Sequence, residues 1–399
     1  MDLTFFSNNV EFFVFVFFLT LLLIFKRKRL TIQGSFPFLY MLLYNTRLGL
    51  DKMSEWSKKM PNFFRYLSYL SIFVAISGIF ISTGFMIYQL KFIVDNNITS
   101  GGGFVLPIKT ESAMEGAVPI FYVPFWYWII ALFVLIIVHE FAHGVIAERW
   151  KVKIKSSGFA FLGIIIPLIP AAFVEPDTKS LNSKKWWQKI AVLGAGSMSN
   201  FIFAILFFFV WIGMCGPFID STMQIGDISF SNVTSQSGFN QYNISSGNIV
   251  AINSVSDKEF ILLKLKNISI DEPLDITLDS GTYLINPYYD NQSNRTMIGV
   301  SGLKSGLVIK DEFEILGNFP IYFERLLFWL FFLNLGIGIM NLLPIWITDG
   351  GQVSLVLLEK IMKPKRAVLI YNIISFFTLI TIIFTLKSSW LIKIISIIF

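Results

Sequence analysis

The chain has 399 residues, of which 54% are hydrophobic and only 15% are charged, and its formal net charge at pH 7 is +6. Soluble domains carry about 25% charged residues, so this composition excludes an ordinary soluble protein and indicates a chain with several membrane spans. A single cysteine, Cys215, excludes an internal disulfide framework and any metal site built from several cysteines.

Long apolar runs predict about six transmembrane helices, each near the ~20 residues that cross a bilayer. In chain order they cover roughly residues 9–25, 67–90, 126–147, 189–214, 321–343 and 367–386. The first run is followed by Lys-Arg-Lys-Arg instead of small residues at a cleavage site, which is typical of a retained anchor. The predicted fold class is therefore a polytopic α-helical membrane protein.

The distribution of basic residues predicts the orientation of these helices. Segments 26–66, 148–189 and 360–366 contain nine, eight and four Lys or Arg, which is 21 of the 32 in the chain. Loops rich in Lys and Arg stay in the cytoplasm, so we expect these segments there and the N-terminus outside. Segment 26–66 is also expected to lie on anionic headgroups. The positive charge is then a topology signal, which favours the lipid bilayer as a partner and not nucleic acid.

The segment 215–320 differs in its pattern of apolar and polar residues from the long apolar runs around it. Short alternating stretches such as NIVAIN and LDITL, separated by turn residues, predict a small, mostly-β domain on the extracytoplasmic side. Six N-x-S/T sequons all fall on segments predicted to be external, although an Asn-rich exterior explains them equally well. They begin at Asn97, Asn232, Asn243, Asn267, Asn291 and Asn294.

Two apolar segments, 158–177 and 341–362, are interrupted by prolines or glycines and match neither a span nor a soluble loop. Irregular backbone at membrane depth is tolerated only where it is buried in protein or lines a water-filled cavity. We therefore expect both segments to form walls of a site.

The only two histidines, His139 and His143, lie four residues apart in the predicted span 126–147. Residues at this spacing share one face of a helix, so both imidazoles can reach a single metal ion. Glu140 then points toward a metal-bound water and can take its proton, as in zinc hydrolases with the H-E-x-x-H pattern. The alternative is that the histidines only pack or hydrogen-bond. Ionisable groups inside a span are costly unless paired or functional, which favours the metal site.

A catalytic zinc site needs a third protein ligand and one open position. No histidine remains, and Cys215 lies near the external end of its helix. Asp349, which follows the helix-breaking Pro344 and precedes two glycines, is the best candidate ligand. Glu175 and Asp177 are the alternatives. Asp349 itself could instead be a turn residue or the N-cap of the helix that follows.

The sequences HEFAH, residues 139–143, and NLLPIWITDG, residues 341–350, together resemble the site-2 protease family of intramembrane zinc metallopeptidases. The resemblance extends to GAGSMSNF, residues 194–201, and to the insert, which looks like a PDZ domain. It implies a four-part organisation: a two-helix membrane extension with an external loop, a first part of the protease core, the PDZ-like domain, and a second part of the core. Their predicted bounds are 1–119, 120–214, 215–320 and 321–399.

The resemblance also implies roles for individual residues. One zinc ion per chain would be bound by His139, His143 and Asp349. Glu140 would be the general base and would pass its proton to the leaving amine, while Asn341 and Asn200 would contact the substrate. The family usually has Gly-Pro-x-x-Asn where this chain has Gly196-Ser197-x-x-Asn200. Interhelical hydrogen bonds are the alternative role for the two asparagines.

The implied function is intramembrane zinc endopeptidase activity, near the cytoplasmic side, on single-span proteins whose external part is already cut. Two other classes compete with it. One is a multi-span zinc protease that cleaves soluble or lipidated tails; known members use a Glu as third ligand, so Asp349-Gly-Gly argues against it. The other is a scaffold or receptor that displays a PDZ-like domain without protease activity, against which the intact Glu140 argues.

Overall fold

A computed structural model describes residues 3–35, 39–96, 98, 102–109, 120–164, 166–291 and 293–387. Contacts within the chain divide it into two compact units. The helical unit comprises Met1–Trp211 and Arg325–Phe399, and the strand unit comprises Ile212–Glu324. The finer division at 119, 214 and 320 stays a prediction.

Among the described residues, five helical stretches are long and apolar enough to cross a membrane, which confirms a polytopic membrane protein. They are α4 (Pro61–Asp95), α5 (Phe125–Arg149), the stretch Ala195–Thr222, α11 (Phe319–Met340) and α13 (Pro364–Leu386). The third stretch consists of α8 (Ala195–Val210), a π-helical segment (Trp211–Cys215) and α9 (Gly216–Thr222). The first predicted span corresponds to α2 (Val10–Phe25), which has 16 residues and follows α1 (Leu3–Asn8). Since ~20 residues are needed to cross, the count of six is not confirmed.

Shorter helices connect the spans of the helical unit. They are the 3-10 helix Arg27–Arg29, α3 (Leu50–Lys59), α6 (Thr178–Asn182), α7 (Trp186–Leu193) and α12 (Asp349–Ile361). One apolar core joins α4, α7, the turn before α12 and α12 itself through Ala75, Ile79, Ile190, Leu193, Leu342 and Val353. This core holds the start of α12 against helices that are distant in the sequence.

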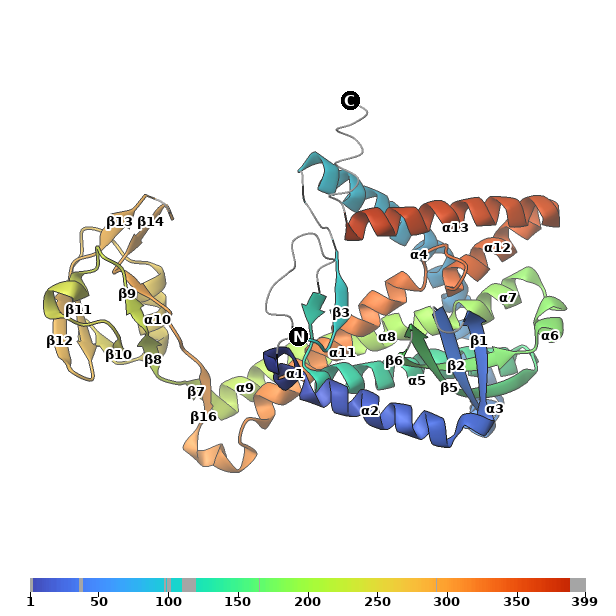
Figure 1. Ribbon diagram of the computed structural model, residues 1–399, viewed down its shortest axis with the longest axis horizontal. Helices are drawn as coiled ribbons and strands as arrows, with labels where there is room; N and C mark the ends of the chain where they lie inside the picture. Colours follow the sequence, from blue (N-terminus) through green and yellow to red (C-terminus); the bar gives the residue numbers. More distant parts are fainter. Residues whose placement is uncertain are drawn as a thin grey trace. The chain divides into compact units, whose positions relative to one another are not determined.

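A four-stranded antiparallel sheet lies beside α5 (Figure 1), and the sequence did not predict it. Its order is β1 (Leu30–Ser35), β2 (Leu39–Thr46), β5 (Ile154–Ile164) and β6 (Ile166–Pro176). The expectation of irregular backbone over 158–177 is therefore wrong. Segment 26–66, which was expected only to lie on headgroups, contributes strands β1 and β2 to this sheet. Pro170 and Pro176 fit because β6 is an edge strand, where a residue without an N–H leaves no ladder bond unmade.

The strand unit is built around a four-stranded antiparallel sheet with one helix, which agrees with the predicted sheet-rich insert. The sheet order is β12 (Gly281–Ile285), β11 (Leu274–Leu278), β10 (Gly247–Ile252) and β8 (Ile228–Phe230), and the helix is α10 (Lys258–Lys266). Apolar side chains such as Phe239, Ile252, Ile261 and Ile276 are fully buried in its core. The PDZ-like identity stays a prediction.

Short elements complete both units. Paired strands in the strand unit are β13 (Tyr288–Asp290) with β14 (Arg295–Met297), β9 (Asn232–Val233) with β15 (Val300–Ser301), and β7 (Met223–Ile225) with β16 (Leu307–Ile309). Two 3-10 helices cover Gly238–Tyr242 and Asp311–Leu316. In the helical unit β3 (Phe104–Leu106) pairs in parallel with β4 (Ile120–Tyr122). The five sequon asparagines of the strand unit are all exposed, and Asn97 lies outside the described residues.

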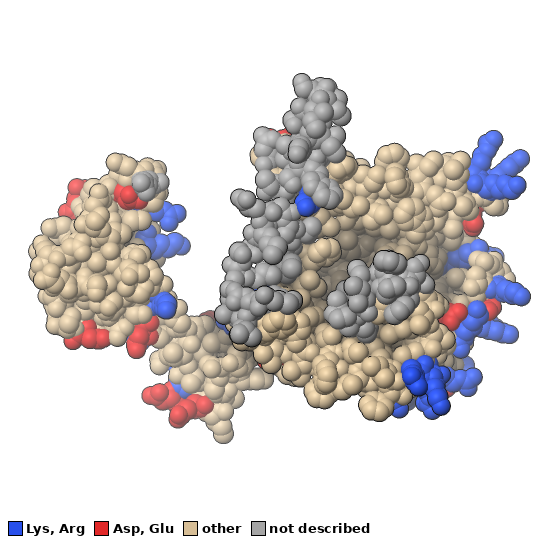
Figure 2. Space-filling model, in the orientation of Figure 1, with Lys and Arg blue, Asp and Glu red and all other residues tan. Residues whose placement is uncertain are grey.

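Basic side chains of the helical unit gather at one of its ends. Figure 2 shows most of the visible Lys and Arg of this unit at the right-hand end, where Figure 1 places the end of α2, the end of α5 and the start of α13. Segments separated by more than 300 residues in the sequence, 26–29 and 363–366, thus contribute to the same basic end.

Candidate metal centre

Helix α5 presents its two histidines on one face, one turn apart. The imidazoles of His139 and His143 are buried, with only 7% and 9% of each residue exposed. Their rings lie edge to face with centroids 4.8 Å apart, and the two Nε2 atoms are separated by 3.1 Å. The i, i+4 spacing therefore brings both ring nitrogens to one point, as predicted from the sequence.

Asp349 reaches the same point because the chain turns sharply before α12. Thr348 caps this helix by accepting a hydrogen bond from the backbone N–H of Gly351 at 3.1 Å. The alternative that Asp349 serves as N-cap is therefore wrong, and its carboxylate is left to face α5. A Cβ on Gly350 or Gly351 would collide with the backbone of Leu342 or Ile345, so both glycines are needed for this close turn.

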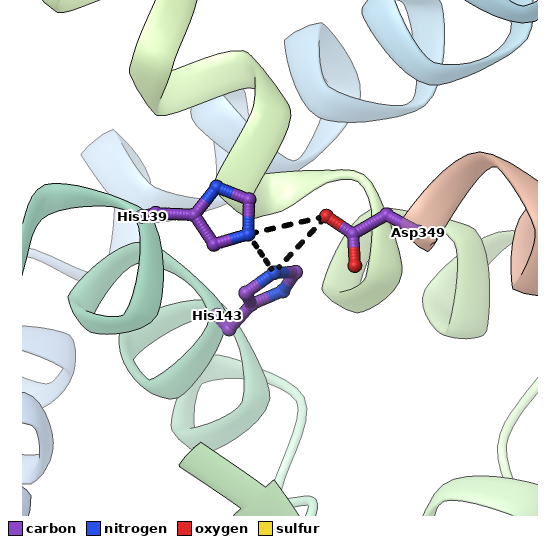
Figure 3. A group of neighbouring side chains, drawn as sticks. All are labelled: His139, His143 and Asp349. Atoms are coloured by element: carbon purple, nitrogen blue, oxygen red, sulfur yellow. Dashed lines mark hydrogen bonds and ion pairs between the residues drawn. The ribbon is translucent and has the colours of Figure 1, made fainter. Parts of the chain in front are cut away.

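The three side chains form a nearly equilateral triangle of ligand atoms (Figure 3). Asp349 Oδ2 lies 3.3 Å from His139 Nε2 and 3.3 Å from His143 Nε2. A tetrahedral zinc ion with N and O ligands at about 2.0–2.1 Å would place those atoms about 3.3–3.4 Å apart. The observed edges of 3.1–3.3 Å therefore fit such an ion, and the donor set of two imidazoles and one carboxylate is one that zinc accepts.

Gly196 on α8 leaves room for this triangle. A Cβ added there would fall on the Nε2 atoms of both histidines. A glycine is therefore required where the helix passes the metal-binding atoms.

Replacing Gly196 with alanine is expected to displace both imidazoles and to weaken zinc binding by at least about tenfold. Loss of a residue that only orients a metal ligand typically weakens metal binding by about 10- to 100-fold, and this variant moves two ligands directly. Zinc per chain, measured on purified protein after dialysis, checks this. Gly336→Ala in α11 is the matched control, because a Cβ there meets nothing within 4 Å. Equal zinc content in both variants would contradict the prediction.

Glu140, the neighbour of the first histidine, does not join the triangle. Its Oε2 accepts a hydrogen bond from the backbone N–H of Val174 on β6 at 2.7 Å. It also lines a cavity of about 190 Å³ between α5 and the sheet, together with Phe133, Phe159 and Ala172. The carboxylate is thus anchored beside the metal-binding atoms while it faces a space that a substrate could enter.

The two alternative acidic ligands lie elsewhere. Glu175 is half exposed and pairs with Lys155 and Ser156. Asp177 accepts a hydrogen bond from the N–H of Ser180 and caps α6. Neither faces the histidines, so of the three carboxylates considered only Asp349 completes the triangle.

The two predicted substrate-contacting asparagines differ in their surroundings. Asn341 is half buried, and its carboxamide makes no hydrogen bond to another described residue, so it remains available to a substrate. Asn200 is fully buried and lies with its carboxamide 3.0 Å from His139 Nδ1. Asn200 is therefore placed to contact His139, a proposed metal ligand, and not a bound substrate.

Three features of the site had no counterpart in the sequence analysis. They are the open edge of β6 beside Glu140, the hydroxyl of Ser197 near Asp349, and the carbonyl of Val192 near His143. Only Ser197 carried a signal, because it departs from the proline of the family pattern.

Comparisons with known proteins agree with this geometry. The model of the family described as Peptidase family M50 matches residues 127–384, which contain all three members of the triangle. Protease RseP of Yersinia pestis is 31% identical over 145 residues, which is 30% of this chain and 31% of that protein.

Two further relatives match over most of their own length. A protein of Clostridium acetobutylicum, whose name includes the words zinc metalloprotease, is 24% identical over 59% of this chain and 87% of its own. A protein of Rickettsia conorii with the same words in its name is 24% identical over 59% of this chain and 88% of its own.

Proposed function

This chain belongs to peptidase family M50, the site-2 protease family of membrane zinc metalloproteases, and we propose that it cleaves single-span membrane proteins within their transmembrane segments. The observation that carries the proposal is the convergence of Asp349 with His139 and His143, two residues of the helix α5 that is long and apolar enough to span a membrane. A hydrolytic site in this place suits a peptide bond that lies inside the bilayer.

His139, His143 and Asp349 would hold the zinc ion, one per chain. When bound, the ion lowers the pKa of a water molecule to about 7 and polarises the scissile carbonyl. Glu140 would take the proton of the attacking water as the C–O bond forms, and would deliver it to the leaving nitrogen as the C–N bond breaks. The N–H of Val174 holds Glu140 in place for both transfers.

The open edge of β6 is a suitable surface for an unwound substrate. A transmembrane helix hides its peptide groups in its own hydrogen bonds, so a cleaved segment must unwind and find new partners. Val174 directs its N–H away from β5, toward Glu140. Because directions alternate along a strand, Ala172 also directs its N–H and C=O to the open edge. Ala172 lies two residues, or about 7 Å, from Val174 along the strand. An extended substrate could pair with this edge as a further strand.

The space beside this edge is apolar. The cavity that contains Glu140 continues along α5 into a second cavity of about 260 Å³, which shares Phe133, Ile137 and Phe159 with it. Side chains of a transmembrane segment are mostly apolar, so this lining suits them. The free carboxamide of Asn341 would supply a further hydrogen bond to the substrate backbone.

Replacing Ala172 with proline is expected to slow cleavage of a membrane substrate roughly threefold to tenfold, the effect of about one lost hydrogen bond. Proline already occupies the outward positions 170 and 176 of β6, so the strand should tolerate it. Ala172→Val, which keeps the N–H, is the control, and zinc content should be unchanged in both variants. Undiminished cleavage by a zinc-loaded Ala172→Pro protein would remove the strand-addition proposal.

The topology follows from the basic end of the helical unit. Positive segments favour the cytoplasmic side, so we place this end there. We keep the sequence-based prediction that the N-terminus and segment 215–320 lie on the other side of the membrane. His139 lies ten residues before the end of α5, which is about 15 Å along a helix. The site would then lie at the cytoplasmic end of the membrane, within reach of water. The strand unit, as a PDZ-like domain, would restrict entry to substrates whose external part has already been removed.

The proposal is tested with purified protein reconstituted into lipid vesicles. A single-span protein with a truncated external part should be cut within its apolar segment, and the same protein with an intact external domain should be cut more slowly. Mass spectrometry of the fragments identifies the cleaved bond. Cleavage confined to soluble flanking sequence would contradict the proposed substrate class.

A further inference from the structure

The start of α8 passes directly against the three proposed metal ligands. Gly196, Ser197 and Asn200 are all buried, and the latter two have no exposed surface at all. A buried hydroxyl and a buried carboxamide in an apolar helix are unfavourable unless their polar atoms are paired. Their partners therefore indicate what these two residues do.

His143 shows how a neighbouring group can select the form of a histidine. Its Nδ1 lies 2.7 Å from the backbone carbonyl of Val192, at the end of α7. A carbonyl only accepts hydrogen bonds, so Nδ1 must carry the proton. The lone pair is then on Nε2, the atom that faces Asp349 and His139.

His139 has Asn200 in the equivalent place. The carboxamide nitrogen Nδ2 of Asn200 lies 3.0 Å from His139 Nδ1, and its Oδ1 has no hydrogen-bond partner among the described residues. The two ends of a carboxamide have nearly the same shape, so either one can face the ring. Only with Oδ1 facing Nδ1–H is the lone pair of His139 on Nε2, toward the metal-binding point.

Asp349 has Ser197 as its neighbour on the same helix. The hydroxyl of Ser197 lies 3.5 Å from Asp349 Oδ2, the oxygen that faces both imidazoles. A hydroxyl can rotate to donate to a carboxylate, and at this distance the bond is a long one. The proline that the family pattern has at this position could not donate at all, so this interaction comes from a residue in which the present chain departs from the pattern.

We propose that Ser197 and Asn200 are positioning residues that orient the metal ligands from α8, Ser197 through Asp349 and Asn200 through His139. Asn200 then acts on the metal site and not on the substrate. This inference rests on the proposed zinc ligands. Partners of this kind typically account for 10- to 100-fold in metal affinity, because they select the tautomer and the orientation of the ligand.

The test measures zinc affinity by competition with a chromogenic chelator, on full-length protein in detergent. Asn200→Leu is expected to weaken binding between about tenfold and a hundredfold, and Ser197→Ala, which loses a longer bond, by about tenfold. The matched control is Ser199→Ala. This variant also removes a buried hydroxyl from α8, but one that donates to the carbonyls of Val138 and Gly196, so its zinc affinity should equal that of the wild type.

A conservative variant separates positioning from packing. Asn200→Asp keeps an oxygen that can accept from His139 Nδ1–H, so zinc affinity should return to within about threefold of the wild type, well inside the range of outer-partner effects. The visible absorption spectrum of the Co²⁺-substituted protein should match the wild type in Asn200→Asp and differ in Asn200→Leu. A purely structural role would instead lower the thermal stability of the metal-free protein without this rescue.

The outcomes distinguish this inference from the proposed function. If Ser197→Ala and Asn200→Leu bind zinc as tightly as the wild type while His139→Ala does not, the positioning role is overturned and the zinc ligands stand. If His139→Ala and Asp349→Ala both keep their zinc, the proposed ligands themselves are wrong.

Discussion

Replacing Glu140 with glutamine is expected to stop peptide hydrolysis while one zinc ion per chain stays bound. General acid–base catalysis contributes about 10²- to 10⁴-fold to a rate, so the cleavage rate should fall by a factor of about 10² or more. Glutamine has nearly the same shape and still offers an oxygen to the N–H of Val174, so the contact between α5 and β6 should survive. What is lost is the capacity to hold a proton between the attacking water and the leaving nitrogen.

The measurement pairs the cleavage rate of a reconstituted single-span substrate with metal analysis of the same sample. Glu148→Gln is the matched control, because it removes a carboxylate from the last turn of the same helix, away from the triangle. Turnover that persists in Glu140→Gln would remove Glu140 as the base. Loss of zinc in that variant would show that Glu140 helps to hold the metal.

Replacing Asp349 with alanine is expected to abolish both stoichiometric zinc binding and cleavage. Outer partners of a ligand account for up to about a hundredfold in affinity, so removal of a ligand itself should cost more than that. Thr348 still caps α12 in this variant, and the two glycines still form the turn, so the fold should survive. The loss would then reflect the missing carboxylate alone.

Zinc per chain after dialysis and the cleavage rate are the two readouts. Glu175→Ala is the control, since Glu175 is one of the two other carboxylates that the sequence offered as a ligand and it faces solvent and Lys155. It should keep zinc and activity. Zinc retained in Asp349→Ala but lost in Glu175→Ala would reverse the assignment of the third ligand.

The two predictions probe different functions of neighbouring groups. Glu140 and His139 are adjacent in sequence, yet one faces β6 and the other faces Asp349. This division follows from the helix, which turns successive side chains by about 100°. The proposed base is therefore held by the sheet and the proposed metal ligands by the helices, and we expect that each can be altered without the other.

Parts of the molecule that depend on local pattern were predictable. The spans α4, α5, α11 and α13 follow from uninterrupted apolar runs, because each must satisfy its backbone internally in a membrane. His139 and His143 share a face because the spacing alone determines it. The turn before Asp349 could be expected from Pro344, because a proline lacks the N–H that would continue a helix there.

The sheet was not predictable in the same way. Segment 158–177 is a short apolar run with prolines, and periodicity cannot distinguish a buried strand from other buried backbone in such a run. Its strands β5 and β6 become recognisable only with β2, whose residue Leu43 pairs with Ala160. Pro170, which suggested irregular backbone, lies on the outer edge of β6, and Pro167 stands where the pairing of β6 with β5 shifts by one residue.

By itself, the sequence determined the membrane character of the chain, and it predicted the metal-binding pattern on α5 and a short set of acidic candidates for the third ligand. Only the tertiary structure brought Asp349, and not the other candidates, to His139 and His143. It also placed the edge of β6 at Glu140 and brought Ser197 and Asn200 to this triangle. The physical reason is the distance along the sequence over which each effect acts. Helix periodicity and hydrophobicity act over a few residues, whereas the triangle joins side chains about 200 residues apart, and their meeting depends on how α5, α8 and α12 pack together.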